Sequence, residues 1–241
     1  MQSKNSQKTR RMVILAVFAA LAYVVMLVIH IKVPPFLTLD VKDAVITLCG
    51  LYFGPLGALL ISLIVPLLEF ITVSDTGWYG LVMNILGSLS FSVTASLIYK
   101  WKKTLSGAIV GLLTAACVMT GVMLLANLVI TPLYMDAGVA QIRALIPKLL
   151  FPFNLIKALL NVGLVLLLYK HIGNALRHAG FLPRKEAIVC QEDGCASPVA
   201  EAPVKRGIWR TVLTTALAAV LITASMVIIF TVLHGEVGFG K

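Results

Sequence analysis

Seven apolar segments separated by short polar connections are the feature of this sequence that most restricts its fold. A helix needs about 20 predominantly apolar residues to cross a bilayer, and it satisfies its own backbone polar groups there. Only 12% of the 241 residues are charged, against about a quarter in a typical soluble domain. The pattern therefore predicts an all-α, polytopic membrane protein. The segments span residues 12–29, 43–53, 55–73, 79–99, 105–131, 149–169 and 211–233.

Two interruptions divide the chain further. The pair Gly54-Pro55 breaks helices, and it separates a short second segment from the third by a tight turn. Residues 184–206 are polar and contain Pro and Gly, which favours a flexible linker. We therefore expect a six-helix membrane domain over residues 1–178, a polar cytoplasmic linker over 179–208, and one extra C-terminal transmembrane helix with a short tail over 209–241.

The basic residues predict the orientation in the membrane. If the N-terminus is cytoplasmic, 14 of the 20 Lys and Arg residues flank the cytoplasmic ends of the segments. Cytoplasmic loops of membrane proteins carry such an excess of basic residues. The lipid bilayer therefore accounts for the net charge of +10, and we expect no nucleic-acid partner.

Polar side chains gather near the outer ends of three predicted helices. Asn84, Asn127, Asn154 and Lys157 all lie within roughly 5–15 Å of the outer surface at about 1.5 Å per residue. Asn161 shares one helix face with Asn154 and Lys157. A lysine within a membrane costs about 2.5–3.5 kcal/mol and is a functional-site hypothesis by default. The alternative is that Lys157 extends outward and the asparagines join helices. Four such groups at one depth favour a binding cavity.

The first outer loop, residues 32–40, is unusually apolar. Pro34 and Pro35 favour an extended backbone, and such a loop is expected to fold onto the mouth of a cavity. Phe36 belongs to a set of outer aromatic residues, most of which fit an interfacial belt. One or two of them could instead stack on a planar ligand.

Motifs of catalytic chemistry are absent from the sequence. It has no G-x-x-x-x-G-K-[ST] and no H-E-x-x-H. Ser88, Ser90 and Ser92 have no histidine partner on a helix, which argues against a serine hydrolase. Cys190 and Cys195 supply at most half of a zinc site. We therefore expect neither an enzyme nor a metal site.

Several short motifs occur in order over roughly residues 10–178 and carry a family resemblance. They are Phe36-Leu-Thr-Leu-Asp40-Val-Lys-Asp43, Tyr52-Phe-Gly-Pro55, Asn84-Ile-Leu-Gly87, Met119 through Asn127 to Pro132-Leu-Tyr134, and Pro152-Phe-Asn-Leu-Ile-Lys157. With them the chain resembles the substrate-binding S-components of energy-coupling factor (ECF) vitamin transporters, and within these the riboflavin-specific branch. The last motif is the most specific of the five.

The resemblance implies a six-helix fold in the plasma membrane of a prokaryote that binds riboflavin from outside, beneath the first outer loop. Riboflavin would be the transported ligand, and no cofactor is expected. A transmembrane coupling protein and two cytoplasmic ATPases would be the partners. In the riboflavin branch the residues that match Asn127, Asn154 and Lys157 contact the flavin. Asn84 also matches a family asparagine, and Phe36 and Asp40 of the loop complete the expected site.

Helix one carries Ala16 and Ala20, a pair of small residues four apart that lets another helix approach closely. This pair could pack within the chain, but the resemblance implies docking to the coupling protein. The chain also departs from the family pattern at Thr38, Val45 and Val65-Pro66, and Glu69 is a nearby polar candidate. The alternatives are the same fold with folate, thiamine or a queuosine precursor as its ligand, a non-transport scaffold or sensor, and a membrane enzyme.

Overall fold

The computed structural model describes residues 4–33, 37–74, 76–135 and 138–181, together with Ala216 and Val220. The predicted linker and C-terminal transmembrane helix lie almost entirely outside these ranges, and so does Phe36. The predictions for these parts therefore stay predictions.

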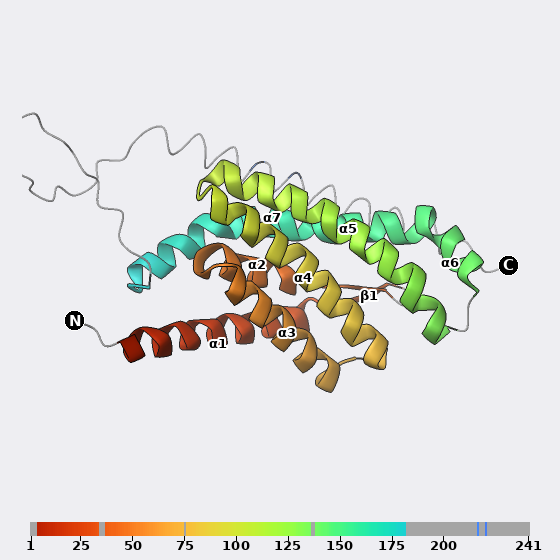
Figure 1. Ribbon diagram of the computed structural model, residues 1–241, viewed down its shortest axis with the longest axis horizontal. Helices are drawn as coiled ribbons and strands as arrows, with labels where there is room; N and C mark the ends of the chain where they lie inside the picture. The colour runs from red at the N-terminus through yellow and green to blue at the C-terminus, as the bar shows by residue number, and fades with distance from the viewer. Residues whose placement is uncertain are drawn as a thin grey trace, which may run out of the picture.

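The first six predicted segments are all helical, and the helices form one elongated bundle with α2 near its middle (Figure 1). Five helical segments are long and apolar enough to cross a membrane, whereas α2 has only 12 residues. The bundle comprises α1 (Lys4–Val28), α2 (Lys42–Phe53), α3 (Pro55–Thr72), α4 (Gly77–Trp101), α5 (Leu105–Met135), and a last segment made of α6 (Val139–Leu145), the π-helical turn η1 (Ile146–Leu150) and α7 (Phe151–His178).

Four predicted boundaries were wrong by four or more residues. Helix α1 begins at Lys4 rather than at residue 12, α7 continues to His178 rather than ending at residue 169, and the other two differences lie near prolines. Helix α5 continues through Pro132 to Met135. A proline removes only its own N–H bond, so a helix in a packed bundle continues when the adjacent turns keep theirs. The last segment begins at Val139 rather than at residue 149, and Pro147 lies in the π-helical turn that joins its two α-helical parts.

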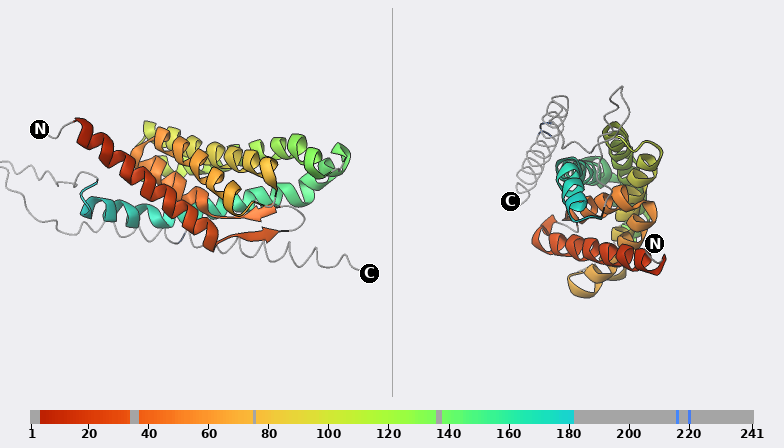
Figure 2. Two further views of the ribbon diagram at one scale, coloured as in Figure 1. Left: turned by 90° about the horizontal axis from the view of Figure 1, so that it is seen from below. Right: turned by 90° about the vertical axis from the view of Figure 1, so that its left-hand side faces the viewer.

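The connection between α1 and α2 is a small antiparallel hairpin of β1 (Ile31–Val33) and β2 (Leu37–Leu39). It lies alongside the first part of α7 (Figure 2). This apolar segment packs against the last helical segment, and its strand pairing was not predicted. The hairpin buries Val33, Leu37 and Leu39 in a cluster with Val41, Ile142, Leu149, Leu150, Phe153 and Leu160.

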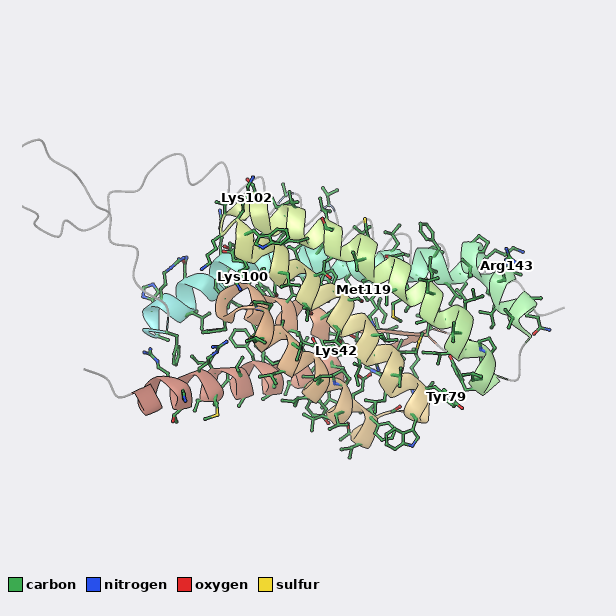
Figure 3. The ribbon with its side chains drawn as sticks, in the orientation of Figure 1. Lys42, Tyr79, Lys100, Lys102, Met119 and Arg143 are labelled. Carbon is green, nitrogen blue, oxygen red and sulfur yellow. The ribbon has the colours of Figure 1, made fainter. Side chains whose placement is uncertain are left out.

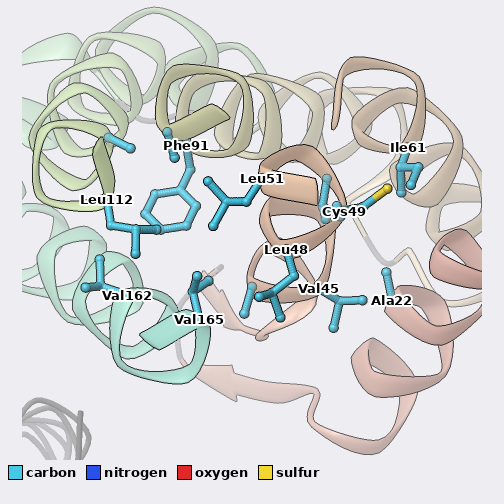
Figure 4. Packing of buried hydrophobic residues seen from close by; sticks show 14 of the residues in the cluster. Ala22, Val45, Leu48, Cys49, Leu51, Ile61, Phe91, Leu112, Val162 and Val165 are labelled. Atoms are coloured by element: carbon cyan, nitrogen blue, oxygen red, sulfur yellow. The ribbon is translucent and has the colours of Figure 1, made fainter. Parts of the chain in front are cut away.

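Helix α2 is the centre of the main core, and ten of its twelve residues are buried. Figure 4 shows its Leu48 and Leu51 among side chains from the surrounding helices. Gly50 is essential to this packing, because a Cβ atom there would lie 2.0 Å from Ser96 Oγ and 2.7 Å from Ala58 Cβ. The small residue lets α2 approach α3 and α4 closely. At Gly54, φ is +94°, which accounts for the glycine in the α2–α3 turn.

Candidate functional site

The first residue of α2, Lys42, is the centre of a buried charge network. Its side chain is 1% exposed and lies deep between the two ends of the bundle (Figure 3). The ammonium group donates to Asp40 Oδ2 at 3.1 Å, Glu69 Oε2 at 2.7 Å and Asn84 Oδ1 at 3.3 Å. All three N–H donors of the ammonium are thereby satisfied. Lys42 thus joins the hairpin segment, α3 and α4 at one point.

Lys157 on α7 joins the same network through Asp40. Its ammonium donates to Asp40 Oδ2 at 2.9 Å and to the carbonyl oxygen of Thr38 in β2 at 3.4 Å. These two bonds hold the hairpin against α7. Within the described residues, the third N–H of Lys157 has no acceptor.

The fully buried Asp40 carboxylate is shared by the two lysines. Burial by itself raises the pKa of this carboxyl group, but the charges of Lys157 and Lys42 and their hydrogen bonds outweigh burial and hold the pKa below its usual value. Asp40 is therefore an anion at neutral pH. Its second oxygen, Oδ1, is buried and has no hydrogen-bond partner in the described part of the chain. A buried acceptor left unpaired is uncommon and calls for a donor.

Two ammonium groups face two carboxylates in this network, so its formal charges balance. Taking four charges out of water is costly, and removing any one of them leaves another uncompensated. Asp43 lies beside the network and is held separately, because Ser88 Oγ donates to Asp43 Oδ1 at 2.5 Å.

Asn127 on α5 and Asn154 on α7 are both buried, at 0% and 1% exposed. Each donates one amide N–H to the carbonyl oxygen four residues earlier in its own helix, Met123 at 2.7 Å and Leu150 at 2.8 Å. Asn127 Oδ1 also accepts from Thr131. The second N–H of each amide and Asn154 Oδ1 have no partner among the residues that the structure describes.

The predicted site residues thus divide into three groups. The structure brings Asn84, Asp40 and Lys157 together in one network. It buries Asn127 and Asn154 on α5 and α7, two helices that pack against each other, but it does not bond them to the network. Phe36 lies outside the described residues.

Asn161 has a structural role in this arrangement. Its Oδ1 accepts the backbone N–H of Ala44 at 2.8 Å, and its Nδ2 donates to the carbonyl oxygen of Lys157 at 2.9 Å. The first N–H groups of a helix have no partner within the helix, and Asn161 on α7 supplies an acceptor for one of them. It fixes the start of α2, where Lys42 begins the network.

Sequence reasoning missed Lys42 and gave Glu69 only as a candidate. Lys42 is one of the six basic residues outside the cytoplasmic set of 14, and no role was predicted for it, whereas the structure buries it. Two signals pointed to the pair. Glu69 is a lone carboxylate in an otherwise apolar helix, and a charge in that setting almost always has a partner. Lys42 stands two residues after Asp40, and only Asp43 separates it from a short apolar run.

The alanines of α1 divide between its two faces. Ala19 and Ala22 are buried, at 7% and 0% exposed, and pack in the main core. Ala16 and Ala20 are exposed. The predicted docking pair therefore lies on the outer surface of the described bundle and is free to meet another helix.

Comparison with known proteins bears on this arrangement. Residues 10–169, more than half of the chain, match the model of a family described as "ECF transporter, substrate-specific component". The chain belongs to this family. The matched residues of this ECF S-component include every residue of the buried network. The family consists of transport subunits, so the prediction that the chain is not an enzyme is confirmed.

A curated relative and a solved structure extend the match. The riboflavin transporter RibU of Staphylococcus aureus (strain TCH60) is 33% identical over 185 residues, which cover 72% of this chain and 95% of the relative. A structure described as the S component of a bacterial ECF transporter aligns with a TM-score of 0.61 at 28% identity. That alignment covers 70% of this S-component and 99% of the solved chain. The predicted helical membrane fold is thereby confirmed.

Proposed function

We propose that this S-component captures riboflavin from outside the cell, for uptake driven by ATP hydrolysis in partner subunits. The observation that carries the proposal is a set of buried polar side chains, before α2 and on α5 and α7, whose hydrogen-bonding capacity is only partly used among the described residues. Asp40 Oδ1 is a buried atom with no partner there, and one N–H each of Lys157, Asn127 and Asn154, together with Asn154 Oδ1, has none either. Such atoms suit a ligand that offers both donors and acceptors. The similarity to RibU supports riboflavin as that ligand.

The donors and acceptors of riboflavin are of the kinds that this set requires. One edge of its ring system alternates carbonyl acceptors with an imide N–H donor, and its tail carries hydroxyl groups. An asparagine amide presents a donor and an acceptor side by side, which suits the ring edge. The free N–H of Lys157 suits a carbonyl or hydroxyl oxygen, and the anionic Asp40 Oδ1 suits an N–H or O–H donor.

The charge network gives the hairpin a role in this capture. Lys157 and Lys42 both bond to Asp40, which follows β2 directly, so the hairpin and the ligand-facing groups of α7 are positioned together. The hairpin buries its apolar side chains over the first turns of α7. A ligand held by Lys157 would therefore lie beneath the hairpin and out of contact with water.

Orientation and assembly complete the proposal. The basic Arg11, Lys100 and Lys103 lie together at one end of the bundle, and we assign that end, with the N-terminus, to the cytoplasmic side of a prokaryotic plasma membrane. The opposite end, which holds Arg143, then faces outward (Figure 3). The exposed Ala16 and Ala20 on α1 would dock to the transmembrane coupling protein, which joins two cytoplasmic ATPases.

Titration of the purified, ligand-free protein with several vitamins tests the ligand. We expect riboflavin to bind tightly, with quenching of flavin fluorescence and a measurable heat, and thiamine and folate to give neither. Heat with thiamine or folate and none with riboflavin would exclude the flavin and leave the fold assignment intact.

A further inference from the structure

A cavity with basic side chains in its wall lies at the end of the bundle away from the charge network. It has a volume of about 340 Å³, within the range of about 300–1,000 Å³ typical of small-molecule sites. Its walls come from the start of α1, the α2–α3 turn and the end of α4. Figure 3 shows Lys100 at this end of the molecule. The polar side chains that line it are Arg11, Tyr52, Ser96, Tyr99, Lys100 and Lys103.

The charge of this cavity is positive, and no described residue in its wall compensates it. Arg11, Lys100 and Lys103 line it, and no carboxylate is among the described residues that do so. The carboxylates of the described chain, Asp40, Asp43 and Glu69, all belong to the charge network or lie beside it. The ammonium groups of Lys100 and Lys103 have no ion-pair or hydrogen-bond partner within the described ranges. The cavity therefore presents unpaired cations to an anion.

The backbone adds to this preference for an anion. The α2–α3 turn contributes Gly54 and Pro55, so the N-terminus of the 18-residue helix α3 borders the cavity. Helix N-termini carry a partial positive charge that favours anions. Arg11 is held in position by one hydrogen bond, from its Nη2 to the carbonyl oxygen of Phe53 at 3.1 Å. The other donors of its guanidinium group are left for a ligand oxygen.

Tyrosines brace the same end of the bundle. The hydroxyl of Tyr52 donates to the carbonyl oxygen of Tyr169, and the hydroxyls of Tyr99 and Tyr169 lie 2.7 Å apart. The rings of Tyr52 and Tyr169 are stacked, with their centroids 5.6 Å apart. These contacts tie α2 and α4 to α7, so the cavity wall is preorganised rather than formed by loose side chains.

The level of the cavity in the membrane identifies the source of the anion. Trp101, beside Lys100 at the end of α4, is 83% exposed, and tryptophan is enriched at the interface between lipid and water. Leu56 at the cavity and Met12 on α1 are exposed apolar residues that suit contact with acyl chains. We propose that this cavity binds the phosphate headgroup of an anionic phospholipid, whose acyl chains lie along the apolar surfaces of α1 and α3.

Native mass spectrometry of the full-length protein with added lipids tests the proposal. Phosphatidylglycerol should remain bound more tightly than phosphatidylcholine, because both carry a phosphate but only the first has net negative charge. In the variant Lys100→Gln/Lys103→Gln, phosphatidylglycerol affinity should fall about 25-fold, at about fivefold for each basic residue. The matched control Lys8→Gln/Lys102→Gln removes two exposed charges that do not line the cavity, and it should change affinity by less than about threefold.

Four outcomes would overturn the proposal. Equal losses in the two double variants would show general surface electrostatics rather than a site. Equal retention of phosphatidylcholine would show that net negative charge is not recognised. Displacement of the lipid by equimolar inorganic phosphate would make free phosphate the ligand. Unchanged lipid binding in Lys100→Gln/Lys103→Gln, with loss of a co-purifying protein, would make the cavity a protein contact. Thermal unfolding of each variant shows whether it is folded.

Discussion

Replacement of Lys42 by methionine tests the charge network most severely, because methionine keeps the length of the side chain and removes its charge. Lys42 is 1% exposed and supplies the one hydrogen bond that the structure gives to the Glu69 carboxylate, which is itself almost completely buried. Breaking a buried ion pair by removing one partner costs about 3–5 kcal/mol. For a chain of this size that loss lowers the melting temperature by about 6–20 °C.

The double variant Lys42→Met/Glu69→Met separates charge from packing. It removes the unpaired carboxylate together with the lysine, and replacing a whole buried ion pair by apolar residues is often close to neutral. We therefore expect the double variant to melt higher than Lys42→Met alone. Lys102→Met, at an exposed position, is the control and should melt like the wild type. Thermal unfolding followed by intrinsic fluorescence in detergent measures all three. A normal melting temperature for Lys42→Met, or a double variant less stable than the single, would refute the network.

Three further predictions concern the site, the core and the assembly. Asn154→Ala should weaken riboflavin binding by about 1–3 kcal/mol in calorimetry, since a hydrogen bond is lost in a dry site; unchanged affinity in a folded variant would move the site elsewhere. Asn161→Ala should lower thermal stability more than it lowers affinity, because it removes the nearer acceptor of the Ala44 N–H and leaves only the carbonyl oxygen of Val41 at 3.2 Å; the reverse order would make Asn161 a ligand contact. Ala16→Trp should abolish uptake by cells and co-purification with the coupling protein while sparing binding by the isolated subunit. Leu113→Trp, on the exposed surface of α5, is its control, and equal loss of uptake in both would show a nonspecific effect.

The helices of this protein were predictable because spanning a bilayer imposes a length and an apolar composition on each one. The early turn at Gly54-Pro55 and the short α2 both appear in the structure. The end of α5 was misplaced because Pro132 was taken to mark it, and the start of the last helical segment was misplaced because only the apolar run from residue 149 was counted. Proline often ends a helix, but a helix packed among neighbouring helices can continue through it.

Contacts between distant residues were the part of the site that the sequence did not reveal. Lys157 and the asparagines were found from their depth along single helices, which needs only the rise per residue. The pairing of Lys42 with Glu69 joins residues 27 positions apart and depends on how α2 lies against α3. The role of Asn161 likewise depends on α7 packing beside the first turn of α2. Helical periodicity placed Asn161 on the same face of α7 as Lys157, but it could not show that the backbone N–H of Ala44 in α2 lies against that face.

Titration of riboflavin into wild type, Lys157→Met and Lys148→Met, followed by flavin fluorescence, tests the central claim most directly. The Lys157 ammonium bonds to Asp40 and has one N–H without a described partner, and Lys157→Met removes this group. Lys148→Met is the control, because Lys148 is exposed near the same end of the last helical segment. A hydrogen bond from a charged donor is worth about 1.5–3 kcal/mol, so Lys157→Met should bind riboflavin about 10–150-fold more weakly. Lys148→Met should bind like the wild type. Tight riboflavin binding by a folded Lys157→Met variant, or none by the wild type, would contradict the account.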